Sequence, residues 1–137
     1  MQENFLDLSN AVYLPNIHDA RVTNIRAYDD TLEFLFDREI HRKVGKICFS
    51  KFDDIYSDVT IQITDTDTDL NIIGKKYYLD DFLPILSTRN FPIMDILEMF
   101  VGYEEVIING VYLNGTGSSQ TRIQIRICAK EMRYQIG

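Results

Sequence analysis

One stretch decides the fold class of this 137-residue chain: Arg122-Ile123-Gln124-Ile125-Arg126-Ile127-Cys128-Ala129. Apolar residues alternate with polar residues or cysteine, and a period of two places successive side chains on opposite faces of a β-strand. The spacing therefore predicts a strand with one face on a core. Its other face carries two arginines and a glutamine toward water or a partner.

A second strand is predicted just before it, over Glu105-Val106-Ile107-Ile108-Asn109-Gly110-Val111-Tyr112-Leu113. This run is too short to span a membrane and is rich in β-branched residues, so we expect a strand buried on both faces, or nearly so. Residues 114–120 favour a loop because Gly and Asn adopt positive φ at little cost. Residues 104–134 are therefore expected to form a β-hairpin.

Upstream, alternating apolar and polar residues predict four more strands, over residues 20–27, 31–37, 46–52 and 59–64. Residues 1–12 are interpreted as a lead-in, with a short frayed helix as one option. Consecutive strands joined by short links pair antiparallel. The expected architecture is therefore an antiparallel sheet of about six or seven strands.

Two short helices are predicted near residues 80–101. The first covers residues 78–86, with Asp80 as a suitable N-cap. The second begins near Pro92, which suits a first helical turn, and ends at Gly102. The apolar residues at helical spacing in it are Ile93, Ile96, Leu97 and Phe100. The predicted fold class is α+β, mainly β, as a sandwich or a partly closed barrel.

Composition limits the class of protein. Apolar residues make up 45% of the chain, which fits a single globular domain over residues 1–137. The formal net charge of −7 argues against nonspecific nucleic-acid binding, which depends on a surplus of Lys and Arg. The first eight residues lack the apolar core of a secretory signal, and no window is apolar enough for a membrane helix. We expect a cytoplasmic protein that binds no membrane.

The two cysteines, Cys48 and Cys128, fit no metal-binding spacing and no C-x-x-C motif. Each lies on the more polar face of its predicted strand, and they are candidates for neighbours across a sheet. In a reducing compartment we expect two free thiols rather than a disulfide.

Motifs for catalysis or cofactor binding are weak. The acidic run of residues 65–69 fails as an EF-hand, because Leu70 and Lys76 occupy the positions that need Gly and Glu. His18, Asp19 and His41 are the candidates for general acid–base chemistry. Side chains of adjacent residues in an extended segment point to opposite faces, so His18 and Asp19 are expected to be poorly placed to bond each other. We expect no metal and no cofactor.

The distribution of charge is more informative. Residues 52–69 contain six aspartates and no Lys or Arg. Residues 80–105 contain Asp80, Asp81, Asp95, Glu98, Glu104 and Glu105 against the single basic residue Arg89, whereas basic residues concentrate in 38–51 and 122–133. A segregated acidic surface would steer a basic protein partner toward it, and Tyr56, Tyr77, Tyr78, Tyr103 and Tyr112 would supply aromatic anchors or lie at the rim of the core. The candidate partner-binding residues are Asp53, Asp54, Asp58, Tyr56, Tyr77 and Tyr78.

Two parts of the chain carry a resemblance. They are His18-Asp19-Ala20-Arg21-Val22 with Leu32, Phe34, Phe36 and Asp37, and Gly74-Lys75-Lys76-Tyr77-Tyr78-Leu79-Asp80-Asp81-Phe82 with Gly102, Tyr103 and Gly110. The pattern resembles small uncharacterised bacterial β-rich proteins. In size and acidity the chain is similar to immunity proteins, which block a toxin by binding it. The likeness in size and style gives the binding hypothesis the specific form of an inhibitor, and the resemblance carries over no activity and no site residue.

Three hypotheses follow. The first is a non-catalytic cytosolic protein-binding module, in its most specific form an immunity-like inhibitor of a basic partner. The second is a small enzyme or ligand-binding barrel in which His18, Asp19 and His41 converge in a cavity. The third is a self-assembling structural protein that pairs through an open strand edge or through the face of Arg122, Gln124 and Arg126.

Overall fold

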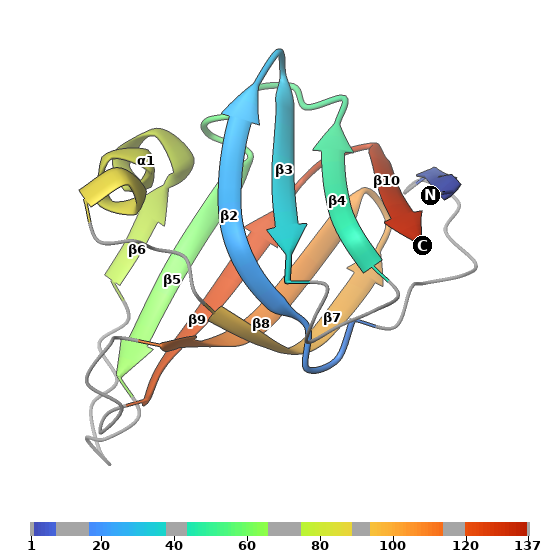
Figure 1. The fold of residues 1–137 in the computed structure, drawn as a ribbon. Helices are drawn as coiled ribbons and strands as arrows, with labels where there is room; N and C mark the ends of the chain where they lie inside the picture. The colour runs from blue at the N-terminus through green and yellow to red at the C-terminus, as the bar shows by residue number, and fades with distance from the viewer. Residues whose placement is uncertain are drawn as a thin grey trace.

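In the computed structural model of this protein, the residues that the structure describes form ten strands, which pair antiparallel in one open sheet (Figure 1). The structure describes residues 2–7, 17–37, 44–65, 75–88, 94–113 and 120–136. The strands are β1 (Gln2–Asp7), β2 (Arg21–Tyr28), β3 (Thr31–Phe36), β4 (Val44–Ser50), β5 (Val59–Asp65), β6 (Lys75–Tyr78), β7 (Met94–Gly102), β8 (Glu105–Leu113), β9 (Gln120–Ile127) and β10 (Glu131–Ile136). One helix, α1 (Leu79–Thr88), lies within the described residues.

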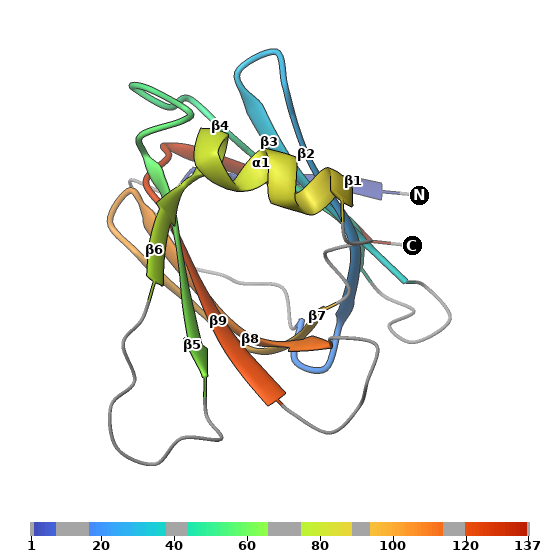
Figure 2. The same cartoon turned by 90° about the vertical axis from the view of Figure 1, so that its left-hand side faces the viewer.

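The sheet consists of two groups of five strands. Its order is β1-β10-β4-β3-β2-β7-β8-β9-β5-β6, so β1 and β6 are its edges. We call β1, β10, β4, β3 and β2 the first half, and β7, β8, β9, β5 and β6 the second half. The strands curve around an interior, and α1 lies across the open side of the curve (Figure 2). The inner faces of the two halves can therefore share one core.

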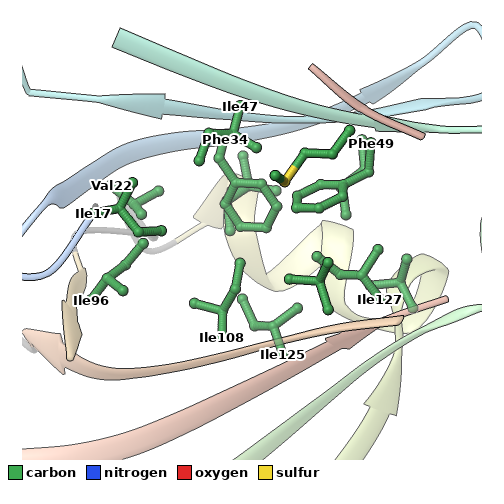
Figure 3. Close-up of a cluster of buried hydrophobic side chains, with 14 of the residues drawn as sticks. Ile17, Val22, Phe34, Ile47, Phe49, Ile96, Ile108, Ile125 and Ile127 are labelled. Carbon is green, nitrogen blue, oxygen red and sulfur yellow. The ribbon is translucent and has the colours of Figure 1, made fainter. Parts of the chain in front are cut away.

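Inward-facing side chains from both halves meet in that core (Figure 3). Phe34 on β3 and Phe49 on β4 contact edge to face, with ring centroids 5.8 Å apart. Ile108 on β8 and Ile125 on β9 lie opposite them. All four side chains are fully buried, so the two halves are held together mainly by the hydrophobic effect.

The join between the halves is short. In the register, β2 and β7 share two residue pairs, Arg21 with Asp95 and Val22 with Met94. The Arg21 guanidinium donates two hydrogen bonds to the Asp95 carboxylate, at 2.8 and 3.2 Å. A bidentate pair of this kind fixes geometry more strongly than a single bond does, so it aligns the two strands where few backbone pairs do so.

The deciding stretch is a strand, as predicted. Ile123, Ile125 and Ile127 of β9 are buried, while Arg122, Gln124 and Arg126 are exposed. In β8 the inward residues are buried and their neighbours are half-buried, which fits the expected run of apolar residues. The antiparallel, mainly β class is thereby confirmed.

The second predicted helix is wrong, because Met94–Gly102 form strand β7. The pairing of β7 with β8 shifts between Ile96 and Glu98, which marks a β-bulge at that point. A bulge changes which alternate residues face the core. The inward residues are Met94 and Ile96 before it, and Met99 and Val101 after it. The residues predicted to form one helical face do not share a face in this strand, because Ile96 is buried, Leu97 is half-buried at the bulge and Phe100 is exposed.

The predicted count of six or seven strands is also wrong. Beside β7, the strands that the sequence does not predict are β1, β6 and β10. β6 has four residues, too few for a clear alternation. β10 starts after a bend at residues 128–130, where the buried positions step from Ala129 to Met132 and break the period of two.

The first predicted helix is present as α1. It begins at Leu79, and Asp80 and Asp81 lie in its first turn, where negative charge complements the helix dipole. Phe82 is fully buried, and its ring lies 5.8 Å from that of Tyr77 on β6. These contacts fix the helix against the second half of the sheet.

Candidate functional site

Two connections cross between the halves at one end of the sheet. Residues 51–58 lead from β4 to β5, and residues 128–130 lead from β9 to β10. They lie side by side, because the backbone N–H of Cys128 donates to the Asp58 carbonyl at 2.9 Å and that of Lys130 donates to Lys51 at 3.3 Å. This is the upper end of the sheet in Figure 1.

Two further segments lie at the same end. Ile127 pairs with Val59 on one side and with Val106 on the other, which places the β7–β8 turn beside the crossing connections. Thr60 pairs with Tyr78, which places the start of α1 there as well. Four segments distant in sequence therefore form one surface.

Carboxylates dominate this surface, which we call the acidic end. Its acidic residues are Asp53, Asp54, Asp58, Asp80, Asp81, Glu104 and Glu105. Lys51 and Lys130 are the basic residues on the crossing connections. Arg126 is paired to Glu105, with nitrogen–oxygen distances of 2.6 and 3.2 Å. The surface therefore has a surplus of negative charge.

Two of these carboxylates also build the loop. Asp54 Oδ1 accepts a hydrogen bond from the Tyr56 backbone at 3.1 Å, and Asp58 Oδ2 accepts one from the Asp54 backbone at 2.9 Å. Ile55 between them is buried and anchors the loop to the core. Asp53 is exposed at the entry to this turn. The loop is thus held in shape by two of its own carboxylate side chains.

A small open pocket of about 70 Å³ lies where the crossing connections meet. Its lining includes Lys51, Asp53, Asp58, Glu104, Cys128 and Lys130. Burial raises the pKa of the Cys128 thiol, and the nearby Glu105 and Asp58 charges act in the same direction against Arg126. The thiol is therefore held in its protonated form, which is a poor nucleophile.

The structure places the candidate tyrosines differently. Tyr56 is 45% exposed and Tyr78 is 51% exposed, both at the acidic end. Tyr77 faces inward and packs against Phe82. Tyr103, in the β7–β8 turn, is 75% exposed. Its position beside the crossing connections depends on strand register, which the sequence does not give.

The structure contradicts one expectation about the histidines. His18 Nδ1 and Asp19 Oδ2 are 3.0 Å apart. Asp19 has a φ of 65°, so the two residues lie in a turn rather than in an extended segment. Both side chains are exposed at the surface. His18 and Asp19 are therefore two proposed acid–base groups that lie together. The third, His41, lies outside the described residues.

The cysteines are not neighbours. Cys48 pairs with Glu33 and Arg133 within the first half, whereas Cys128 follows β9 in the second half. Neither cysteine forms a disulfide, and the Cys48 thiol donates a hydrogen bond to Glu33 Oε2 at 3.7 Å. The shared polar face of their strands suggested proximity, but the order of the strands separates them.

A buried carboxylate that sequence reasoning missed lies in the first half. Glu33 is on the outer face of β3, yet it is 1% exposed because neighbouring side chains cover it. Arg26 donates to one carboxylate oxygen, from Nε at 2.8 Å and from its terminal nitrogen. The other oxygen accepts from the Tyr28 hydroxyl at 2.7 Å, and Lys46 Nζ lies 3.7 Å away. We call these four residues the Glu33 cluster.

The Glu33 cluster shifts the titration of its members. Burial acts to raise the pKa of Glu33, but the hydrogen bonds from Tyr28 and Arg26 and the charges of Arg26 and Lys46 outweigh it, so the pKa is lowered. The hydrogen bond to Glu33 is the largest of the influences that raise the pKa of Tyr28 to about 12. The carboxylate is therefore ionised and fully occupied at neutral pH.

Comparison with protein-family models, curated proteins and solved structures finds no match to this chain. Within the described residues, no group of three or more His, Cys, Asp or Glu side chains is placed to hold a metal ion. In the same residues, no helix is long and apolar enough to cross a membrane.

Proposed function

We propose that this protein is a non-catalytic binding module that recognises a basic protein partner through its acidic end. The observation that carries the proposal is the assembly of seven carboxylates and three exposed tyrosines from four distant segments onto one surface. An immunity-like inhibitor of a basic enzyme or toxin is the most specific form of this function.

Electrostatics supports the proposal through the rate of association. A surface with one dominant sign of charge attracts an oppositely charged partner and raises the on-rate, most strongly at low salt. Asp54 and Asp58 are already held by backbone N–H groups, so they lose little freedom when a partner docks. The loop is therefore preorganised for binding.

The exposed tyrosines support it through affinity. Tyr56 and Tyr103 stand among carboxylates, and tyrosine is enriched among residues whose removal costs most binding energy. A ring beside a carboxylate suits a partner's Lys or Arg, which stacks on the ring and pairs with the charge. The acidic end thus offers a basic partner long-range electrostatic attraction, which raises the association rate, and close contacts, which raise the affinity.

The test is an affinity capture from host lysate followed by binding measurements on the captured partner. The variant replaces Asp53, Asp54 and Asp58 by Asn, which removes three charges but keeps an oxygen that can accept the loop's hydrogen bonds. We expect about tenfold weaker binding at low salt and a shallower salt dependence. The matched control replaces Asp65, Asp67 and Asp69 by Asn, an equal number of charges elsewhere in the chain. Equal affinities of the two triple variants would contradict the proposal.

A further inference from the structure

Among the residues that the structure describes, strand β7 has no partner on one side over part of its length. β2 pairs with β7 at Asp95 and Met94, backbone hydrogen bonds with Asp19 and Ala20 extend this pairing to Ile96, and β8 pairs with β7 as far as Gly102. Within the described residues, Glu98–Gly102 therefore have a strand on the β8 side alone. Five residues of strand span roughly 17 Å, and alternate residues direct both their N–H and C=O groups toward the open side.

Glu98–Gly102 contain no lysine, the residue that commonly protects a strand edge. The sheet's terminal edge strand β6 carries Lys75 and Lys76, and lysines on an edge discourage pairing with another chain. In contrast, β7 has the sequence Met-Asp-Ile-Leu-Glu-Met-Phe-Val-Gly and no Lys or Arg. Phe100 on its outer face is 54% exposed. The open part of β7 is thus a template for strand addition.

The two faces of this edge define what an added strand must carry. Met99 and Val101 face inward and pack against the core, yet they are half-buried. Apolar side chains of an added strand would cover them. On the outer face Glu98 and Phe100 are exposed, and Glu104 follows in the turn. A Lys or Arg there would pair with a carboxylate or stack on the Phe100 ring.

We propose that the open edge of β7 binds an extended segment of the basic partner, in which Lys or Arg alternates with apolar residues. This inference rests on the proposed function and extends it, because the β7–β8 turn joins this edge to the acidic end. Strand addition would supply backbone hydrogen bonds for affinity, and the alternation would supply specificity.

The test uses synthetic peptides as probes. One alternates Lys with Ile or Val over seven residues, a second has the same composition with the Lys grouped in one block, and a third is the first with alternate amides N-methylated. Affinity is measured by fluorescence anisotropy, and the site is located by amide hydrogen exchange. We expect the alternating peptide to bind about tenfold more tightly than either control. We also expect it to slow exchange within Glu98–Gly102.

Two variants locate the site further. Phe100→Ser should weaken the alternating peptide severalfold. Phe5→Ser is the matched control, because Phe5 is also 54% exposed and lies on edge strand β1. Equal binding of the three peptides, protection at β1 or β6 instead of β7, or an unchanged affinity of Phe100→Ser would overturn the proposal. Self-association that Phe100→Ser abolishes would also overturn it, since the occupant would then be a second copy.

Failure of this inference is distinct from failure of the proposed function. Suppose that the captured partner binds less tightly when Asp53, Asp54 and Asp58 are replaced, but that Phe100→Ser changes the affinity of neither the partner nor the peptides. The proposed function is then supported and the binding site on β7 is rejected. If the alternating peptide slows exchange in β7 but no partner binds through the acidic end, the binding site on β7 is supported and the proposed function is rejected.

Discussion

The carboxylate of Glu33 and the carboxylates of the acidic end have opposite environments. Glu33 is buried on the outer face of the first half, where Arg26, Tyr28 and Lys46 occupy its oxygens. Asp53 and its neighbours lie on the surface of the acidic end, where the bonds they make are to their own loop. A carboxylate that is fully paired within the chain stabilises the fold, and one that faces water is available to a partner. Net charge alone does not separate these roles.

The largest expected effect comes from breaking the Glu33 cluster. Glu33→Gln removes the charge that two cations share and leaves an amide that matches their donors poorly. We expect a loss of about 2 kcal/mol in the free energy of unfolding, measured by urea denaturation. The control is Leu35→Gln, which places an amide at a half-buried position of the same strand. A Glu33→Gln protein as stable as the wild type would remove the distinction between the two groups.

The same cluster predicts a dependence of stability on pH at both extremes. The folded pKa of Glu33 is lowered, so its contribution is present above the unfolded pKa and is lost as pH falls through the folded value. The folded pKa of Tyr28 is raised to about 12, so its contribution is complete below the unfolded value near 10 and is lost as pH rises through 12. Tyr28→Phe should flatten the alkaline limb, and Glu33→Gln should flatten the acid limb. Denaturation midpoints across pH check both.

A smaller effect should separate shape from charge within the acidic end. Asp54→Ala removes the oxygen that accepts from the Tyr56 backbone, and we expect a loss of about 1 kcal/mol, as for a lost helix cap. Asp54→Asn keeps an acceptor and should change stability by less than about 0.5 kcal/mol. Equal losses for the two substitutions would show that the charge, and not the acceptor, holds the loop.

The smallest effect on stability is expected for Asp53→Asn. Its side chain is exposed, and exposed charges contribute little to the free energy of unfolding. We expect a change within about 0.5 kcal/mol in thermal or urea denaturation. A loss comparable to that of Glu33→Gln would mean that the acidic end is a structural element and not a free surface.

Much of the sheet was predictable from the sequence because alternation is a local signal. The alternation predicts that Ile123, Ile125 and Ile127 face the core, and it predicts the same for Leu32 and Phe34. All five are buried. The signal fails where geometry interrupts it. The bulge in β7 interrupted the alternation that marks a strand, and the bend before β10 broke its period. Both interruptions arise from long-range pairing, which a local pattern does not contain.

Candidate binding residues could be grouped from the sequence only where they are close in it. Asp53, Asp54, Tyr56 and Asp58 share one loop, and their role in binding stays a prediction. Tyr103 joins them through the pairing of three strands, and Glu33 meets Lys46 through the register of β3 with β4. Gly110 is a similar case. A Cβ atom added at this position would lie 2.8 Å from the Asp95 carbonyl oxygen. The close approach of β7 to β8 therefore explains why the residue is a glycine.

The crossing connections have a consequence for how the chain reaches its native state. The second half is continuous in sequence, from Val59 to Ile127, so it can form as soon as that segment is made. The first half is divided, because β10 inserts between β1 and β4. β1, which is synthesised first, has β10 as its neighbour in the sheet, and β10 is synthesised last. Closing so long a loop costs entropy that local contacts do not offset, so we expect β1 to dock late and slowly. β4 exposes an unpaired edge until β10 is made, and β10 exposes one until β1 docks, so this interval is when the nascent protein is most prone to aggregate.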